Sequence, residues 1–221
     1  MNNLNIQTKR KTLFRLFPYI SDKDAVGKLK IDDESIYYIS IREYAEKILS
    51  IIKFHLDMIN KNISSSIITD STSGVGGDTI SFAKEFKKVY SIEINEERYK
   101  ILKNNTSVYS LKNIEFINND CTKCITNIID HDVVYIDPPW GGKGYKNHKC
   151  LRLNISNISI EQFCNNLMNS QIMKNIPNII VLKLPMNYDI IYFYKNVNKK
   201  NIYHYDLGKM IILVIMVNLN T

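Results

Sequence analysis

The sequence predicts an α/β fold with a seven-stranded, mostly parallel sheet. From residue 41 onward, short apolar runs alternate with segments of helical periodicity. The first of these runs leads into a glycine-rich turn, and the last two are close enough to pair as an antiparallel hairpin. Alternation of this kind places helices on both faces of an open sheet, which is the doubly wound arrangement of Rossmann-like folds.

The individual elements follow from helix-capping residues, apolar periodicity and turn signals. Residues 1–34 are expected to form a short N-terminal helical extension or irregular arm, and residues 35–221 the main domain. Ser40 and Asn95 are good N-cap residues for helices over 41–59 and 96–109. The remaining expected elements are strands at 67–70, 89–93, 114–118, 132–137 and 176–184, helices at 76–86, 121–128 and 159–168, and a closing hairpin of 201–205 with 210–217.

Length and charge restrict the classes of function. A chain of 221 residues can bury a substantial core in one α/β domain, and its net charge of +7 favours polyanionic partners such as nucleic acid. The longest apolar run, 210–217, suits a buried strand and is too short to span a bilayer. The N-terminus does not resemble a signal peptide. We therefore expect a soluble, intracellular monomer of the nucleus or cytoplasm, without a membrane partner.

The four cysteines, without a secretion signal, indicate reduced thiols. Cys121 and Cys124 form a C-x-x-C motif that His148 and Cys150 could complete as a zinc site. No second C-x-x-C follows, and the intervening strand and turn have another use. We therefore expect no metal.

The strand expected at 132–137 ends in the most informative motif of the chain, Asp137-Pro138-Pro139-Trp140 followed by two glycines. The prolines fix φ and remove two backbone donors, so the carbonyl groups before them stay free. An acid, free carbonyls and an indole then project from a strand's carboxyl end, where open α/β sheets bind ligands. Methylating an amine on a flat heterocycle requires such acceptors and such a stacking surface. The plainer reading is a proline-rich turn with Trp140 in the core.

A second set of candidate residues follows the ends of neighbouring predicted strands. Glycines in the turn 70–77 let backbone N–H groups approach a ligand, and Glu93 is placed to bind the ribose hydroxyls of an adenosine cofactor. Acids flank this turn, which disfavours the pyrophosphate of NAD and suits the cationic groups of S-adenosylmethionine (SAM). The expected SAM-binding residues are Asp70, Ser73, Gly74, Gly76, Glu93, Asp120 beside the adenine amine, Cys121 and Asp137.

With these motifs the chain resembles the RNA cap guanine-N2 methyltransferases, the trimethylguanosine synthase family. That family carries a glycine-rich turn like residues 73–80, a Pro-Pro-Trp-Gly-Gly turn followed by a tyrosine, and a later Leu-Pro-x-Asn loop. Residues 138–142, Tyr145 and residues 184–187 match these elements, and the similarity runs from about Gly27 to the end. The resemblance implies a SAM-dependent methyltransferase fold and adds Ser40 and Thr79 to the cofactor residues.

The resemblance also implies a substrate, the 7-methylguanosine cap of RNA, with methylation of its exocyclic N2 amine to form a hypermethylated cap. A 7-methylated guanine is cationic and would stack on an indole with about 1–2 kcal/mol of cation–π energy. Basic side chains would bind the cap phosphates. The expected catalytic residues are Asp137, Pro138, Pro139 and Trp140, and the expected cap-binding residues are Trp140, Lys143, Tyr145, Lys146 and Asn187.

Two positions depart from the family pattern. The family has serine at the position of Asp137, whereas adenine-N6 enzymes have aspartate there, as this chain does. The family also has a basic residue at the position of Met186. Two other functions therefore stay open. One is an adenine-N6 or ribosomal guanine-N2 methyltransferase, which would flip its base out of folded nucleic acid. The other is a catalytically silent methyltransferase-fold subunit, although the acids and the Pro-Pro-Trp turn are intact.

Overall fold

The computed structural model describes residues 10–199 and 201–218 and contains the predicted seven-stranded sheet. The strand order is β3-β2-β1-β4-β7-β9-β8. The first five strands of this order pair in parallel, and β9 runs antiparallel to both of its neighbours. The strands are β1 Ile67–Asp70, β2 Lys88–Ile92, β3 Ile114–Ile117, β4 Val133–Ile136, β7 Ile179–Pro185, β8 Ile202–Asp206 and β9 Met210–Met216.

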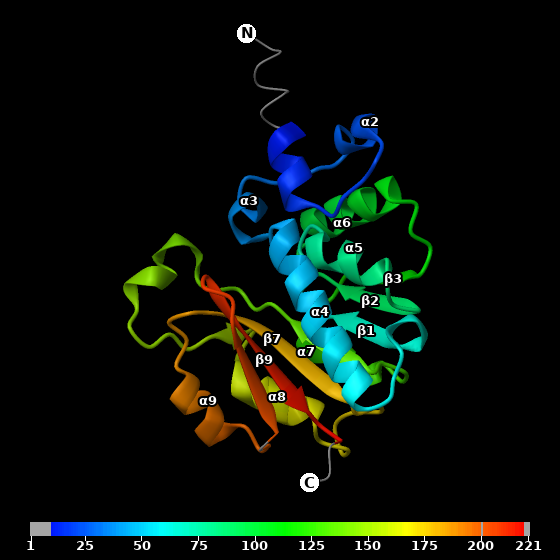
Figure 1. Ribbon diagram of the computed structural model, residues 1–221. Helices are drawn as coiled ribbons and strands as arrows, with labels where there is room; N and C mark the ends of the chain where they lie inside the picture. The colour runs from blue at the N-terminus through cyan, green and yellow to red at the C-terminus, as the bar shows by residue number, and fades with distance from the viewer. Residues whose placement is uncertain (1–9, 200, 219–221) are drawn as a thin grey trace.

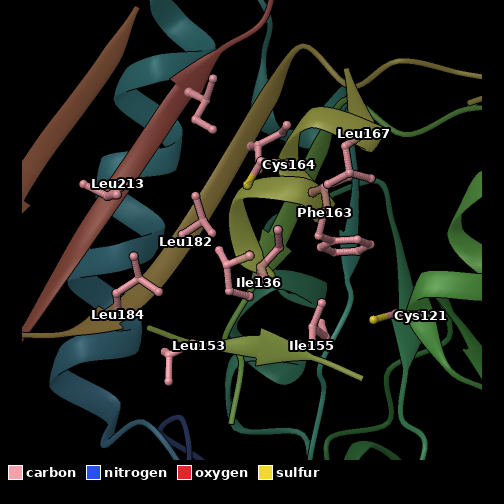
Figure 2. Close-up of a cluster of buried hydrophobic side chains, with 14 of the residues drawn as sticks. Cys121, Ile136, Leu153, Ile155, Phe163, Cys164, Leu167, Leu182, Leu184 and Leu213 are labelled. Carbon is pink, nitrogen blue, oxygen red and sulfur yellow. The ribbon is translucent and has the colours of Figure 1, made fainter. Parts of the chain in front are cut away.

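Helices cover both faces of this sheet (Figure 1). One face packs against α4 and α5 through a cluster that includes Ile52, Phe82 and Tyr135. The opposite face packs against α8, and Figure 2 shows Phe163 and Leu167 of this helix beside Ile136 and Leu182. The longer helices are α4 Arg42–Met58, α5 Gly77–Ala83, α6 Glu96–Val108, α8 Ile160–Leu167 and α9 Ile190–Asn196, and the short ones are α2 Lys23–Val26, α3 Ser35–Tyr38 and α7 Cys121–Cys124.

Short elements complete the connections between the main strands and helices. The 3-10 segments are η1 Ile63–Ser65, η2 Ile125–Asn127 and η3 Gly142–Asn147. A two-stranded hairpin, β5 Asn154–Ile155 with β6 Ile158–Ser159, lies between η3 and α8. The chain order of the sheet reverses between β1 and β4, which lie side by side in its centre. Ligands of open α/β sheets bind outside the strand ends at such a reversal.

The N-terminal arm packs against the rest of the domain. Leu13, Leu16 and Phe17 are buried in a cluster that also contains Ile80 of α5. Tyr109, just after α6, donates its hydroxyl proton to the Pro18 carbonyl at 2.6 Å. The described part of the arm thereby packs on α5. Helix α3, which follows the arm, reaches the cavity at the carboxyl ends of the central strands.

The fold predicted from the sequence is confirmed, with corrections to individual elements. Ser40 is not an N-cap, because α4 begins at Arg42 after an extended Ile41 that makes no side-chain cap. The strand expected from residue 176 begins only at Ile179, since Pro177 has no N–H for the ladder. The helix expected over 76–86 ends at Ala83. Helix α9 and the β5–β6 hairpin were not predicted.

Candidate active site

A cavity of about 600 Å³ opens at the carboxyl ends of the central strands. Its walls combine segments that lie far apart in the sequence, and most of the predicted site residues meet there. The predicted residues in its lining are Ser40, Asp70, Ser73, Gly74, Glu93, Asp120, Cys121, Asp137, Pro138, Pro139, Trp140, Tyr145 and Lys146. Gly76, Thr79 and Asn187 are not in the lining, and the side chain of Lys143 lies outside the described part of the structure.

The glycine-rich turn and Glu93 form one end of the cavity. Gly74 has a φ of +53°, and a side chain there would meet open space. Its N–H donates to Glu93 Oε2 at 2.8 Å, while Oε1 accepts the N–H of Asn95 at 2.7 Å. Each carboxylate oxygen still has a free lone pair for a ligand hydroxyl. Burial raises the pKa of Glu93.

Gly76 and Thr79 lie behind this wall and support it. A Cβ on Gly76 would lie 2.8 Å from Leu102 Cδ1, so only glycine lets the turn approach α6 this closely. The Thr79 hydroxyl donates to Asp70 Oδ2 at 2.5 Å. Burial raises the pKa of Asp70 to about 7, and the nearby Asp78 and Asp137 carboxylates add to the shift. Thr79 therefore acts through Asp70 and does not line the cavity itself.

Asp120 and Cys121 form a second wall at the start of α7. Asp120 Oδ1 caps this helix by accepting the Thr122 N–H at 2.9 Å and the Thr122 hydroxyl at 2.7 Å. Burial alone would raise the pKa of Asp120, but hydrogen bonds from Thr122 and Ser156 hold it below its usual value. Burial also raises the pKa of the Cys121 thiol, so this side chain is a protonated, apolar wall. Ser156, from the unpredicted β5–β6 turn, lines the cavity as well.

Asp137 follows β4 and lines the cavity next to the glycine-rich turn. Its N–H donates to Thr72 Oγ1 at 2.8 Å, which ties the Asp-Pro-Pro-Trp turn to the glycine-rich turn. Its Oδ2 accepts a hydrogen bond from Lys183 Nζ at 2.6 Å. Burial raises the pKa of Asp137 to about 6, although the Lys183 ammonium opposes this shift.

A buried polar network connects Asp137 to the glycine-rich side. Lys183 Nζ also donates to Ser40 Oγ at 2.8 Å, and Ser40 donates in turn to Asp78 Oδ2 at 2.8 Å. The Tyr135 hydroxyl donates to the same Asp78 oxygen at 3.0 Å. Asp78 Oδ1 is buried and has no hydrogen-bond partner among the described residues. Ser40, predicted as a helix cap, thus bridges a lysine and an aspartate.

The sequence reasoning missed Lys183 and gave Asp78 only a flanking role. A recognisable signal was present in both cases. Lys183 is the one charged residue in a strand whose other members, from Ile179 to Pro185, are apolar and buried. A fully buried lysine is almost never found without a partner, so this position indicates a buried acid nearby.

Trp140 forms a further wall of the cavity together with Tyr145. The indole is half-buried and meets the Tyr145 ring edge to face, with centroids 5.3 Å apart and an interplanar angle of 74°. Gly141 and Gly142 have φ values of +88° and +71°, which turn the chain sharply into η3. The Trp140 ring therefore lines the cavity. The plainer reading, which placed this ring inside the core, is wrong.

Asn187 supports the Trp140–Tyr145 wall from outside the cavity lining. Its Nδ2 donates to the carbonyl of Tyr145 at 2.8 Å and to that of His148 at 2.7 Å. The loop after β7 is thereby fixed to η3. Lys146 is exposed at the rim of the cavity, where a phosphate group could reach it.

Within the described residues, no helix is both long and apolar enough to cross a membrane.

Comparison with known proteins places this geometry in a family. The family described as RNA cap guanine-N2 methyltransferase matches residues 65–214. The uncharacterized protein L320 of Acanthamoeba polyphaga mimivirus is 36% identical, over 96% of this chain and 93% of its own length. The trimethylguanosine synthase of Schizosaccharomyces pombe is 32% identical, over 56% of this chain and 51% of its own length.

Solved structures share the fold. The 16S rRNA N2 G1207 methyltransferase of T. thermophilus, determined with AdoMet and guanosine, superposes with a TM-score of 0.59 at 14% identity, over 85% of this chain and 43% of that one. The precorrin-6y C5,15-methyltransferase of Geobacter metallireducens gives 0.57 at 12% identity, over 85% and 92%. The chain therefore belongs to the RNA cap guanine-N2 methyltransferase family, and it is a methyltransferase with the Rossmann-like fold of SAM-dependent enzymes.

Proposed function

We propose that this enzyme transfers a methyl group from SAM to the exocyclic N2 amine of the 7-methylguanosine cap of RNA. The observation that carries the proposal is the shared cavity. Glu93 and Gly74 line it together with Asp137 and Trp140, so a nucleoside donor and a flat acceptor base would share one enclosed space. Its volume of about 600 Å³ lies within the usual range for ligand sites.

The residues present fit a cationic adenosine cofactor. The Asp78 and Asp137 carboxylates raise the pKa of Asp70, and Asp78 also raises that of Asp137. Among the described residues, the Lys183 ammonium pairs with Asp137 in this acidic group. Asp78 Oδ1 is buried without a donor, and an α-ammonium group would supply one. When bound, SAM supplies an electrophilic methyl group on a positively charged sulfur.

Glu93 and Asp120 would orient the nucleoside part of the cofactor. The free lone pairs on the two Glu93 oxygens suit a pair of ribose hydroxyls. Asp120 keeps its carboxylate ionised through the hydrogen bonds at the start of α7 and would accept from the adenine amine. Cys121 would pack beside the adenine ring as an apolar surface.

Asp137 and the carbonyls before the prolines would orient the acceptor amine. The nitrogen lone pair would form the new C–N bond as the methyl–sulfur bond breaks, and the neutral thioether would leave with that electron pair. The alkylated amine would then release one proton to the Asp137 carboxylate or to water. Hydrogen bonds from the amine to these acceptors direct the lone pair along the line of attack. Positioning is expected to contribute most, because the electrophile is already charged and the alkylated amine is acidic.

Trp140, Tyr145 and Lys146 would select the cap. The exposed part of the indole offers a stacking surface for the cationic 7-methylguanine ring. The Lys146 ammonium at the rim, together with the net charge of +7, would attract the cap phosphates. Asn187 would act indirectly, by fixing η3.

A second candidate is methylation of guanine N2 or adenine N6 within a longer RNA. The observation in its favour is the carboxylate of Asp137 at the first position of the Pro-Pro turn. A similar stretch also occurs in an RNA methyltransferase of Prochlorococcus marinus, 33% identical over 56% of this chain and 29% of that protein.

One assay separates these candidates. Labelled SAM is supplied in parallel with 7-methyl-GTP, with unmethylated GTP and with an adenine-containing oligonucleotide, and the labelled nucleosides are identified by chromatography. The proposal predicts label on N2 of 7-methylguanosine alone, and the same separation distinguishes one added methyl group from two. Label on adenine or on unmethylated guanine would refute the cap assignment. Absence of transfer despite SAM binding would indicate a silent subunit.

A further inference from the structure

Lys183 lies behind the cavity wall and forms an ion pair with Asp137, which lines the cavity. The distance between Nζ and Oδ2 is 2.6 Å, and the lysine side chain is only 3% exposed. The strand β7 contributes the lysine, and the catalytic turn after β4 contributes the acid. The pair therefore joins two neighbouring strands at the point where the acceptor amine is proposed to bind.

A lysine between two buried leucines is costly to keep charged. Burial alone would lower the pKa of Lys183, but Asp137, Asp78 and Asp70 hold it above its usual value. Two of its donors are directed, one to Asp137 Oδ2 and the other to Ser40 Oγ. The ammonium is thus held between fixed acceptors on two different segments and has little freedom to rotate away.

The groups that face Asp137 show why it needs this partner. Asp78 from α5, Asp70 from β1 and Tyr135 from β4 lie in the same polar cluster. Burial, together with the Asp78 carboxylate, favours the protonated form of Asp137. Lys183 is the charged group in this cluster that favours the ionised form of Asp137, and the Trp140 N–H adds a smaller contribution. The contact of Lys183 with Oδ2 also occupies that oxygen and leaves Oδ1 for another donor.

We propose that Lys183 is a positioning residue for methyl transfer: it keeps Asp137 ionised and fixes Oδ2, so that Oδ1 receives an N–H of the acceptor amine. This role rests on the proposed function only in its choice of acceptor. Any amine placed beside Trp140 would be oriented by the same oxygen. Lys183 itself touches neither the acceptor nor the methyl group in this arrangement.

The test compares the variants Lys183→Met, Lys183→Arg and Asp137→Ser/Lys183→Met. In Lys183→Met we expect the acidic limb of the kcat–pH profile to move to higher pH by about one unit, with about a fivefold loss of kcat at pH 6. Lys183→Arg keeps the charge and should retain the original limb. The double variant removes the titrating carboxylate together with the lysine, so its profile should lose the shifted acidic limb of Lys183→Met.

A matched control breaks a different ion pair at the other end of β4. Lys61 Nζ lies 2.6 Å from Asp132 Oδ1, far from the cavity lining, so Lys61→Met should leave the pH profile unchanged. Thermal unfolding of every variant reports folding. If Lys183→Met alone fails to fold and the double variant folds, the lysine is shown to balance Asp137. A double variant that keeps the shifted acidic limb of Lys183→Met would overturn the proposal, because the limb would then not report Asp137.

A readout without turnover separates this proposal from the identity of the substrate. The carboxyl carbon of Asp137 is followed by ¹³C NMR through a pH titration of wild type and Lys183→Met, with no acceptor present. The midpoint should rise in the variant. An unchanged midpoint together with an unchanged pH profile would refute the role of Lys183, whichever nucleoside the methylation assay identifies.

Discussion

The carboxylate of Glu93 has two tasks at once, because it fixes the glycine-rich turn and faces the cavity. Glu93→Ala should weaken SAM binding by roughly 10- to 100-fold, since hydrogen bonds to a charged group contribute about 1.5–3 kcal/mol. Titration calorimetry measures the change. Glu93→Gln, which keeps an acceptor for the Gly74 N–H, is the control and should lose less. Unchanged affinity in the alanine variant would remove Glu93 from the cofactor site.

Trp140 offers a residue-scale test of how the cavity is divided. Trp140→Ala should abolish methylation of 7-methyl-GTP and leave SAM affinity within about threefold, because the stacking energy belongs to the acceptor. Kinetics and calorimetry on the same preparation measure both quantities. Trp140 also packs against both main core clusters, so the thermal midpoint must be recorded alongside. An equal loss of SAM affinity would contradict the assignment.

At the scale of elements, α4 and the C-terminal hairpin are joined through a histidine. His55 is fully buried, its Nε2 lies 2.8 Å from the Tyr205 hydroxyl, and its Nδ1 has no partner among the described residues. Burial lowers the pKa of His55 to about 4. The folded state therefore binds this proton less readily than the unfolded state, whose histidine titrates near its ordinary value of about 6.5.

The interface between α4 and β8 should accordingly weaken in acid. The contribution of neutral His55 to the free energy of unfolding is complete above about pH 6.5. It decreases as the pH drops toward about 4, by at most roughly 3 kcal/mol. His55→Phe should flatten this part of the curve of unfolding free energy against pH. The pKa of His131, also buried, is lowered too, and its contribution remains in the variant as an internal reference. A variant with the same pH dependence as wild type would show that α4 does not depend on neutral His55.

The sequence predicted elements well where a local pattern determines them. Asn95 caps α6 and Ser159 caps α8 because both make short-range bonds within the chain. Ser40 was misplaced, since its partners lie 38 and 143 residues away and no local signal reports them. The ion pair of Lys183 and Asp137 was missed for the same reason. The strand ends that carry acids were predictable, whereas the bonds between those acids depend on tertiary packing.

At the scale of the whole molecule, the N-terminal arm adds its own core to the domain. Phe17 is buried between the arm and α5, so Phe17→Ala should lower the free energy of unfolding by about 3–5 kcal/mol. Urea unfolding measures this change. Phe14→Ala is the matched control, because that ring is 39% exposed and should cost no more than about 1 kcal/mol. Equal effects at the two positions would mean that the arm does not contribute a core.

The two hydrogen bonds of Asn187 have a consequence for the speed of substrate capture. They tie the wall that carries Tyr145 to the end of β7 before any nucleotide arrives. A slot held open in this way gives up little conformational entropy on association. Encounter with a cap should therefore be limited by diffusion and charge attraction, and not by the folding of a loop around it.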